Sequence, residues 1–220
     1  MKLKYYFQTN WLQTLFFNFR KFPLHQALHL PVIFFRGTEI RSMKGKIYLP
    51  EKVRHGMIKI GRADVTGWEG RKTVMCFDGE IVFKGKAIIG SGSVIDVKKD
   101  AVLTVGSKFR ITAGTTIYCR KAIEFGNEVL ISWDTLIMDS DHHCVCDLES
   151  GKVLNNDLPV VIGDHVWIGC RNTLLKGACV GDDCVVAAGS ILTGNFSGER
   201  NAVIGGRAGR VLRSGIRWQE

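Results

Sequence analysis

The sequence of 220 residues has little proline, no acidic residue near its start and no long apolar run. Its four prolines against 25 glycines exclude a proline-rich linker and favour repeated tight corners over disorder. No apolar run approaches the roughly 18 residues that cross a membrane. The N-terminus also lacks the continuous apolar stretch that follows the basic start of a signal peptide. We therefore expect one folded domain, with at most a small appendage.

Charge is distributed unevenly along a chain whose net charge is +9. Five basic residues precede the first acid, Glu39, and arginines recur between Arg200 and Arg217. The middle is nearly balanced, so we expect no nucleic-acid partner. An anionic cofactor, an anionic glycan or a membrane surface remains a candidate partner. The seven cysteines, an odd number, favour free thiols in a reducing cytoplasm.

The dominant pattern is an aliphatic or aromatic residue at every sixth position, which neither a helix nor a single strand produces. A period of six arises when a chain makes a short straight run, turns a corner and repeats. It therefore predicts a parallel β-helix, in which three hexads form one triangular coil of about 18 residues. The repeats between Ile40 and Val82 are irregular. The regular positions are Phe83, Ile89, Ile95, Val105, Ile111, Ile117, Phe125, Ile131, Ile137, Ile162, Ile168, Leu174, Val180, Val186, Leu192 and Ile204.

Residues 1–38 differ from the repeats and predict a small helical segment ahead of a β-helix domain at 39–217. Asn10 can serve as an N-cap and Pro23 ends the helix. We expect the apolar side of this helix to pack across the open end of the β-helix and cover its edge. Its basic and aromatic residues also permit contact with a membrane surface. The residues that share the apolar helical face are Trp11, Leu12, Leu15, Phe16 and Phe19.

The repeat stops after Ile137 and leaves a protruding polar loop at 139–160. Loops of this length in compact domains are most often functional. This loop opens with two carboxylates and two histidines. A carboxylate beside an imidazole is the usual arrangement of a general base, because it orients the ring and stabilises the imidazolium. The candidate catalytic residues are Asp139, Asp141, His142 and His143.

Two other interpretations of the loop remain open. It can be a solvated polar loop, or it can hold a metal through its histidines with Cys144 and Cys146. The C-x-C spacing of these cysteines departs from the spacing of structural zinc sites, so we expect no metal.

Small residues beside Trp167 form a second group of candidates. The run 187–190 and Thr193 would leave backbone groups exposed beside a groove, along which an extended amide-containing ligand can lie. Arg210 and Arg213 follow and are placed in sequence to meet phosphates. The alternative is a solvated basic tail. We expect the last basic stretch to form a closing strand or a short helix.

Two stretches resemble a known family. VVIGDHVWIGCRNTLLKGACVGDDCVVAAGSILT is similar to the signature of the hexapeptide-repeat acyltransferases, which include the galactoside, maltose and xenobiotic O-acetyltransferases. FGNEVLISWDTLIMDSDHH resembles a subgroup found among capsule and lipopolysaccharide biosynthesis enzymes. The resemblance implies an all-β, left-handed parallel β-helix. It also implies a homotrimer with acetyl-CoA sites between subunits, and direct transfer to an acceptor with a loop histidine as general base.

The resemblance also implies roles for the catalytic candidates. The D-x-D-x-H pattern of the subgroup places the base at His143, whereas the galactoside enzyme's pattern places it at His142. We favour His143, because the SWD and D-x-D residues match the subgroup more closely. Asp139 and Asp141 would orient the base or contact the acceptor.

The same resemblance implies a path for the cofactor. Trp167 would flank the pantetheine arm, and the arginines would meet the nucleotide phosphates. Three departures bear on this path. Cys170 replaces a serine or alanine of some relatives, and Gly194 replaces a common lysine. The family's G-x-P-A-K ending loses its proline here, where Gly206 is followed by RAGR, so the rigid turn before Arg210 is missing. The implied cofactor-binding residues are Trp167, Cys170, Ala188, Gly189, Thr193, Arg210 and Arg213.

These observations predict an acetyl-CoA-dependent O-acetyltransferase that acts on a sugar or glycan precursor, in the cytoplasm or at the inner membrane surface. One alternative is an N-acyltransferase that acts on an amino sugar. Another is a metal hydratase like the γ-type carbonic anhydrases, although His142, His143 and His165 have the wrong spacing for its three ligands. The third is a non-catalytic β-helix scaffold.

Overall fold

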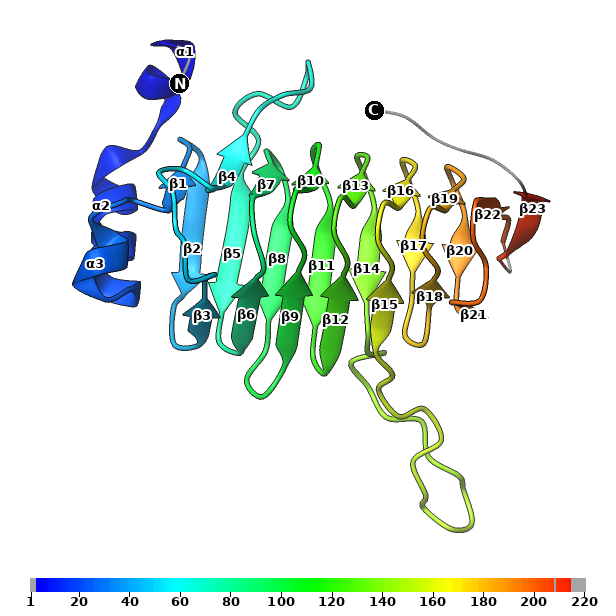
Figure 1. Ribbon diagram of the computed structural model, residues 1–220. Helices are drawn as coiled ribbons and strands as arrows, with labels where there is room; N and C mark the ends of the chain where they lie inside the picture. The colour runs from blue at the N-terminus through cyan, green and yellow to red at the C-terminus, as the bar shows by residue number, and fades with distance from the viewer. Residues whose placement is uncertain (1–2, 208, 215–220) are drawn as a thin grey trace.

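The computed structural model describes residues 3–207 and 209–214, and its body is a parallel β-helix (Figure 1). Strands of successive coils stack into three sheets, which form the sides of a triangular prism. The first sheet contains β1 (Val32–Phe34), β4 (Ile58–Arg62), β7 (Ala87–Gly90), β10 (Phe109–Ile111), β13 (Leu130–Ile131), β16 (Trp167–Ile168), β19 (Val185–Val186), β22 (Ala202–Gly205) and β23 (Arg210–Ser214).

The other two sheets are built in the same way. The second contains β2 (Thr38–Ser42), β5 (Thr73–Phe77), β8 (Val94–Val97), β11 (Thr116–Cys119), β14 (Leu136–Met138), β17 (Thr173–Leu174) and β20 (Ile191–Leu192). The third contains β3 (Lys46–Tyr48), β6 (Glu80–Phe83), β9 (Val102–Val105), β12 (Ala122–Phe125), β15 (Val160–Ile162), β18 (Cys179–Val180) and β21 (Asn195–Phe196). Strand β23 pairs antiparallel with β22, so residues 210–214 of the basic stretch form the closing strand that the sequence allows.

The six-residue period is confirmed by the register of the strands. Its marked residues point into the prism, where each is at most 4% exposed, and they stack in three columns. One column follows each sheet, so a position in one coil faces its equivalent in the next. In the second sheet, for example, Ile95, Ile117, Ile137, Leu174 and Leu192 lie in register. This stacking makes the continuous apolar core on which a solenoid depends.

Three helices precede the solenoid: α1 (Leu3–Gln8), α2 (Trp11–Lys21) and α3 (Leu24–Ala27). As predicted, Asn10 caps α2 by accepting a hydrogen bond from the backbone N–H of Gln13, and α2 ends before Pro23. Strand β1 already belongs to the first sheet, so the first coil starts inside the segment 1–38. Within the described residues, no helix is long and apolar enough to cross a membrane.

The predicted packing face of α2 is wrong. The helix does lie against β1, but it does so through Thr14, Phe17 and Asn18. The side chain of Asn18 donates to the carbonyl of Val32 and accepts from its N–H, while Thr14 Oγ1 accepts from the N–H of Phe34. The open edge of β1 needs hydrogen-bond partners, so polar residues face it. The apolar residues of the predicted face are left partly or fully exposed.

The corners of the prism position the candidate site. We name as corner I the turns from the first to the second sheet, as at 169–172 and 187–190. Corner II denotes the turns from the second to the third sheet, which include the long loop 139–159 and the short turns 175–178 and 193–194. In Figure 1 the loop extends away from the prism between β14 and β15. The second sheet separates corner I from corner II.

Candidate active site

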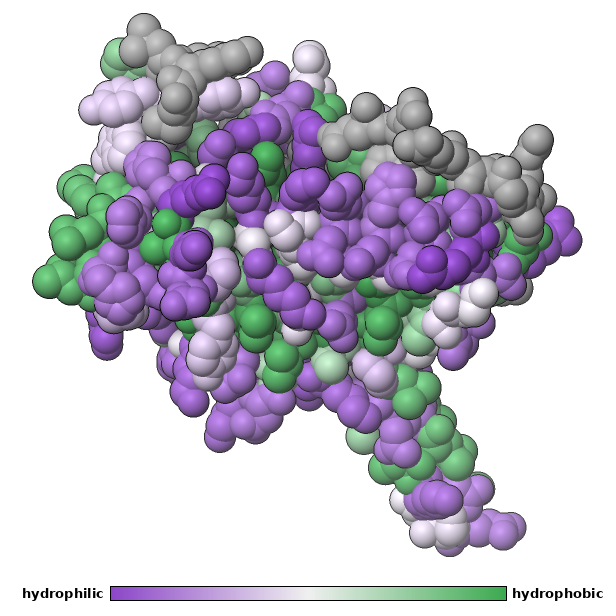
Figure 2. Space-filling view, in the orientation of Figure 1, coloured by the Kyte–Doolittle hydropathy of each residue, from purple (hydrophilic) through white to green (hydrophobic). Residues whose placement is uncertain are grey.

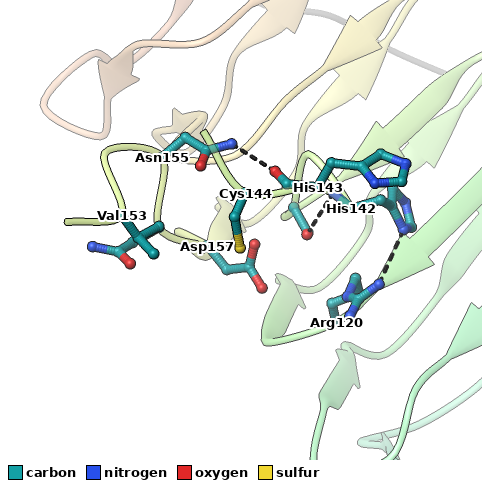
Figure 3. A pocket seen from close by; sticks show the side chains of 9 residues that line it. Arg120, His142, His143, Cys144, Val153, Asn155 and Asp157 are labelled. Carbon is teal, nitrogen blue, oxygen red and sulfur yellow. Dashed lines mark hydrogen bonds between the residues drawn. The ribbon is translucent and has the colours of Figure 1, made fainter. Parts of the chain in front are cut away.

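The base of the loop at corner II encloses a cavity of about 210 Å³. Both candidate histidines line it, together with polar residues from the returning half of the loop (Figure 3). The cavity therefore lies where the repeat is interrupted, as the sequence predicts for a site. The lining residues are Arg120, Ser140, His142, His143, Cys144, Val153, Asn155, Asn156 and Asp157.

Asp139 is fully buried at the base of the loop. Its carboxylate accepts hydrogen bonds of 2.7–2.8 Å from the backbone N–H groups of Arg120, Lys121 and Ala122 in the preceding coil. It also lies 3.7 Å from the Cys119 thiol, whose pKa is raised by burial and by this negative charge. Asp139 therefore holds the corner together and does not reach an acceptor, in contrast to one of its predicted roles.

Asp141 binds residues that fix the path of the loop. Its Oδ2 accepts from Lys176 Nζ at 2.5 Å and from Asn155 Nδ2 at 2.8 Å. These two hydrogen bonds lower the pKa of Asp141 below its usual range. Asn155 Nδ2 also donates to the carbonyl of His143 at 2.8 Å. The carboxylate of Asp141 thus positions the backbone beside His143, and among the described residues no hydrogen bond joins it to an imidazole.

The ring of His142 is held against the preceding coil. Its Nδ1 lies 3.4 Å from Arg120 Nη1, and its ring meets Tyr118 edge-on with centroids 5.5 Å apart. Guanidinium is only a donor, so Nδ1 of His142 is the acceptor and the proton of the neutral ring lies on Nε2. In this arrangement neither nitrogen of His142 has a free lone pair with which to take a proton from an acceptor.

His143 is exposed, and its ring is drawn beside that of His142 at the cavity (Figure 3). Its backbone is fixed through the carbonyl that Asn155 binds. Within the described part of the chain, no hydrogen bond occupies its ring nitrogens, so a lone pair is available to an acceptor hydroxyl. The geometry favours His143 over His142 as the base.

The predicted cofactor residues gather mainly at corner I. The side chain of Trp167 on β16 donates from Nε1 to Ser132 Oγ at 3.1 Å, which ties the indole to this corner. Ala188 and Gly189 are exposed in the next coil, and Cys170 is partly exposed. The N–H of Gly189 donates to the carbonyl of Cys170, so this amide serves the solenoid and is not available to a ligand.

The remaining cofactor candidates lie farther apart. Thr193 is exposed at corner II, across the second sheet from Trp167. Arg210 begins β23 and lines a cavity of about 240 Å³ with Arg207 and three glycines, Gly205, Gly206 and Gly209. This cavity continues corner I by one coil, because the N–H of Ile191 donates to the carbonyl of Gly206. Arg213 lies in β23, but its side chain is outside the described residues.

Sequence reasoning missed several residues of the site. Lys176 and Arg120 come from the coils on either side of the loop, and Asn155 comes from its returning half. Lys176 could have been found from the strand register. Ile137 pairs with Leu174, so Lys176 lies one coil beyond Asp139. Trp133, which is 38% exposed at corner I, was also missed.

The three histidines of the metal-hydratase alternative do not converge within one chain. His165 lies at the corner between the third and first sheets, where its Nδ1 is 3.0 Å from Asp183 Oδ1. His142 and His143 lie at corner II. The described residues contain no group of three or more potential metal ligands.

Comparisons with known proteins agree with the repeat pattern. Residues 159–194 match the family profile "Bacterial transferase hexapeptide (six repeats)". The chain is 31% identical over 87 residues to polysialic acid O-acetyltransferase of Neisseria meningitidis, covering 39% of this chain and 40% of the relative. It is 29% identical over 109 residues to galactoside O-acetyltransferase of Escherichia coli strain K12, covering 50% of this chain and 52% of the relative. The chain thus spans about half or less of the length of these two relatives.

Two further comparisons extend over more of the chain. The putative lipopolysaccharide biosynthesis O-acetyl transferase WbbJ of Escherichia coli strain K12 is 26% identical over 144 residues, covering 62% of this chain and 72% of the relative. The solved structure of the polySia specific acetyltransferase NeuO superposes with a TM-score of 0.64 at 19% identity, covering 86% of this chain and 79% of that chain. The resemblance to hexapeptide-repeat acyltransferases and the left-handed parallel β-helix are confirmed.

Proposed function

We propose that this protein transfers an acetyl group from acetyl-CoA to a hydroxyl of a sugar or glycan precursor. The observation that carries the proposal is the cavity at the interruption of the hexapeptide solenoid, beside which the ring nitrogens of His143 make no hydrogen bond to the described residues. A regular solenoid has no structural need for a loop at this corner, since the neighbouring turns 175–178 and 193–194 close without one. The O-acetyltransferases among the relatives support the reaction class.

In this mechanism His143 takes the proton of the acceptor hydroxyl while the hydroxyl oxygen attacks the acetyl carbonyl. Acetyl-CoA supplies an activated thioester, whose carbon–sulfur bond breaks as the new ester bond forms. The proton held by His143 then passes to the departing thiolate. Asn155 holds the backbone of His143 in place, and Asp141 with Lys176 holds Asn155. Positioning of this kind supports general-base catalysis because the base must lie within hydrogen-bond reach of the proton.

Corner I has the features of a surface for the pantetheine arm. Trp167 offers an exposed apolar ring, and the small residues Ala188 and Gly189 leave room beside the backbone. The cavity at Arg207 and Arg210 continues this edge and supplies positive charge for phosphates. The residues present therefore fit an extended anionic thioester better than a compact metabolite.

We propose that the site is shared between subunits of a homotrimer. Corner I and the His143 loop lie on opposite edges of the second sheet. A strand of three residues spans roughly 10 Å, so one chain holds its two half-sites apart. A neighbouring chain can bring its own loop to this chain's corner I, and closure between subunits would exclude water from the thioester.

The reaction class is tested by mixing the purified protein with acetyl-CoA and a panel of neutral sugars, sialic acid oligomers and amino sugars. The expected result is acceptor-dependent release of the CoA thiol, followed by detection of an O-acetyl ester in the product. Formation of an amide with amino sugars alone would replace O-transfer by N-transfer. Failure to bind acetyl-CoA in calorimetry would reject both and favour the scaffold alternative.

The shared site is tested by complementation. We expect His143→Ala and Ala188→Glu each to abolish turnover, the first by removing the base and the second by placing a charge in the cofactor path. In trimers formed from a mixture of the two chains, about a quarter of the interfaces would combine an intact loop with an intact corner I, and activity would return. Ala188→Glu mixed with Arg210→Glu is the control, because both changes lie on the same edge. No recovery in the first mixture would contradict a shared site.

The proposed location of the reaction is the cytoplasm. All seven cysteines are free, including the exposed Cys144 and Cys146, which suits a reducing compartment.

A further inference from the structure

The outward side of α2 and α3 is an apolar surface that the solenoid does not use. Leu12, Leu15, Phe16 and Phe19 follow the i, i+3, i+4, i+7 spacing of one helical face, and Leu12 is 83% exposed. Leu24 and Leu28 extend the same end of the molecule, where Figure 2 shows hydrophobic residues gathered over α2 and α3. We name this surface the outer apolar face; it comprises Leu12, Leu15, Phe16, Phe19, Leu24 and Leu28.

This surface is not a remnant of core packing. The opposite side of α2 already satisfies the edge of β1 through Thr14 and Asn18, and Phe17 contributes the apolar contact. Phe17 is fully buried and its ring lies 4.8 Å from that of Phe34. The helix therefore has two distinct sides, of which only the inner one has a partner within the described chain. Contiguous exposed apolar surface of this kind marks an interaction site.

The charge around the outer apolar face indicates the chemistry of its partner. No acidic residue occurs before Glu39, whereas five basic residues do. Arg20 is exposed on α2, and His25 is exposed on α3. Lys21 is not part of this charge pattern, because its ammonium donates to the carbonyls of Met43 and Gly45. The helices α2 and α3 thus present an apolar face together with exposed basic side chains and no acidic side chain of their own, the pattern of helices that lie in the interface of an anionic membrane.

The position of the helices suits a flat surface. They lie at the N-terminal end of the solenoid, clear of the long loop (Figure 1). The sides of the prism, with corners I and II, remain free when that end is covered. We propose that the outer apolar face docks on the surface of a bilayer containing anionic lipids, with its leucines and phenylalanines inserted at the headgroup level and Arg20 at the phosphates.

Vesicle binding tests this proposal on the full chain. The protein is co-sedimented with vesicles of phosphatidylcholine mixed with phosphatidylglycerol, and separately with phosphatidylcholine alone. We expect binding to the anionic vesicles that weakens as salt is raised. The triple variant Leu12→Ser, Phe16→Ser, Phe19→Ser should bind about 100-fold more weakly, because three apolar side chains no longer leave water. Leu148→Ser, at the exposed tip of the loop, is the matched control and should bind like the unaltered protein.

Each outcome decides the proposal. Circular dichroism of the triple variant should match that of the unaltered protein, because the replaced residues lie outside the core. Weaker vesicle binding by the triple variant, with unchanged binding by Leu148→Ser, supports the proposal. Absence of binding by the unaltered protein, or equal binding by the triple variant, overturns it. If light scattering shows an assembly that the triple variant dissolves and no vesicle binding occurs, a second copy of this chain occupies the face and the membrane proposal is wrong.

Discussion

The two corners of the fifth coil are built on different principles. At corner I the chain turns within 132–135, between β13 and β14, and Ser132 and Thr135 are buried. At corner II the same coil leaves the prism for the whole of 139–159 before β15 begins. The first turn repeats at 169–172 and 187–190, whereas the second has no equivalent in the next coils.

The difference between the two corners shows which interactions hold each of them in place. The short corner is fixed by the core, because the residues on both sides of it, Ile131 and Ile137, are fully buried. The loop has few buried side chains and depends on polar contacts. Asp139 and Asp141 bind neighbouring coils, and Asn155 binds Asp141 within the loop. A repeated corner suits an extended ligand that contacts several coils. A single loop suits a reaction that needs one base at one place.

The largest effect should follow from removal of the proposed base. We expect His143→Ala to lower acceptor-dependent CoA release by about 100- to 10,000-fold, the range that general-base catalysis contributes. His142→Ala is the matched control. This variant removes a ring whose Nδ1 Arg120 already binds, so its turnover should fall far less than that of His143→Ala. A large loss in His142→Ala with near-normal turnover in His143→Ala would reverse the assignment.

The second prediction separates the two carboxylates of the loop. Asp139→Ala should lower the free energy of unfolding by about 3–5 kcal/mol, because three partly buried backbone N–H groups lose the carboxylate that accepts their hydrogen bonds. Asp141→Ala removes an exposed carboxylate and should cost only a small fraction of that amount. Urea denaturation of both variants measures the difference. Equal stabilities would mean that Asp139 is not the residue that holds the corner.

Much of the solenoid could be predicted from the sequence, because burial repeats along the chain. Each marked residue, such as Ile117 or Leu174, is specified locally by its neighbours six positions away. Which face of α2 packs against the solenoid could not be predicted in this way. Its apolar face predicted packing, but the edge of β1 required the hydrogen-bonding side chains of Thr14 and Asn18. Hydrophobic periodicity does not report where unpaired backbone groups lie.

The candidate site was predictable only in part for a similar reason. The interruption and its histidines are visible in the sequence, but the partners of the loop come from other coils. Lys176 lies 35 positions after Asp141 in sequence, yet their side chains are 2.5 Å apart. Finding that pair requires the register across the inserted loop, which the sequence alone does not supply.

The smallest predicted effect concerns this pair and its dependence on pH. Lys176→Met should raise hydrogen exchange of the loop amides about two- to five-fold at neutral pH, as expected for loss of an exposed ion pair. Lys84→Met, which removes the exposed pair with Glu124 on the regular coils, is the control and should leave the loop unchanged. Lys176 and Asn155 lower the pKa of Asp141, so the contact is fully present above the usual aspartate range. It is lost as pH falls through the lowered pKa, where Asp141 becomes neutral. The difference between Lys176→Met and the unaltered protein should therefore shrink in acid, leaving only the part that comes from the hydrogen bond of Lys176 Nζ to the carbonyl of Asn155. A difference that does not shrink would show that Lys176 holds the loop through that carbonyl and not through the carboxylate of Asp141.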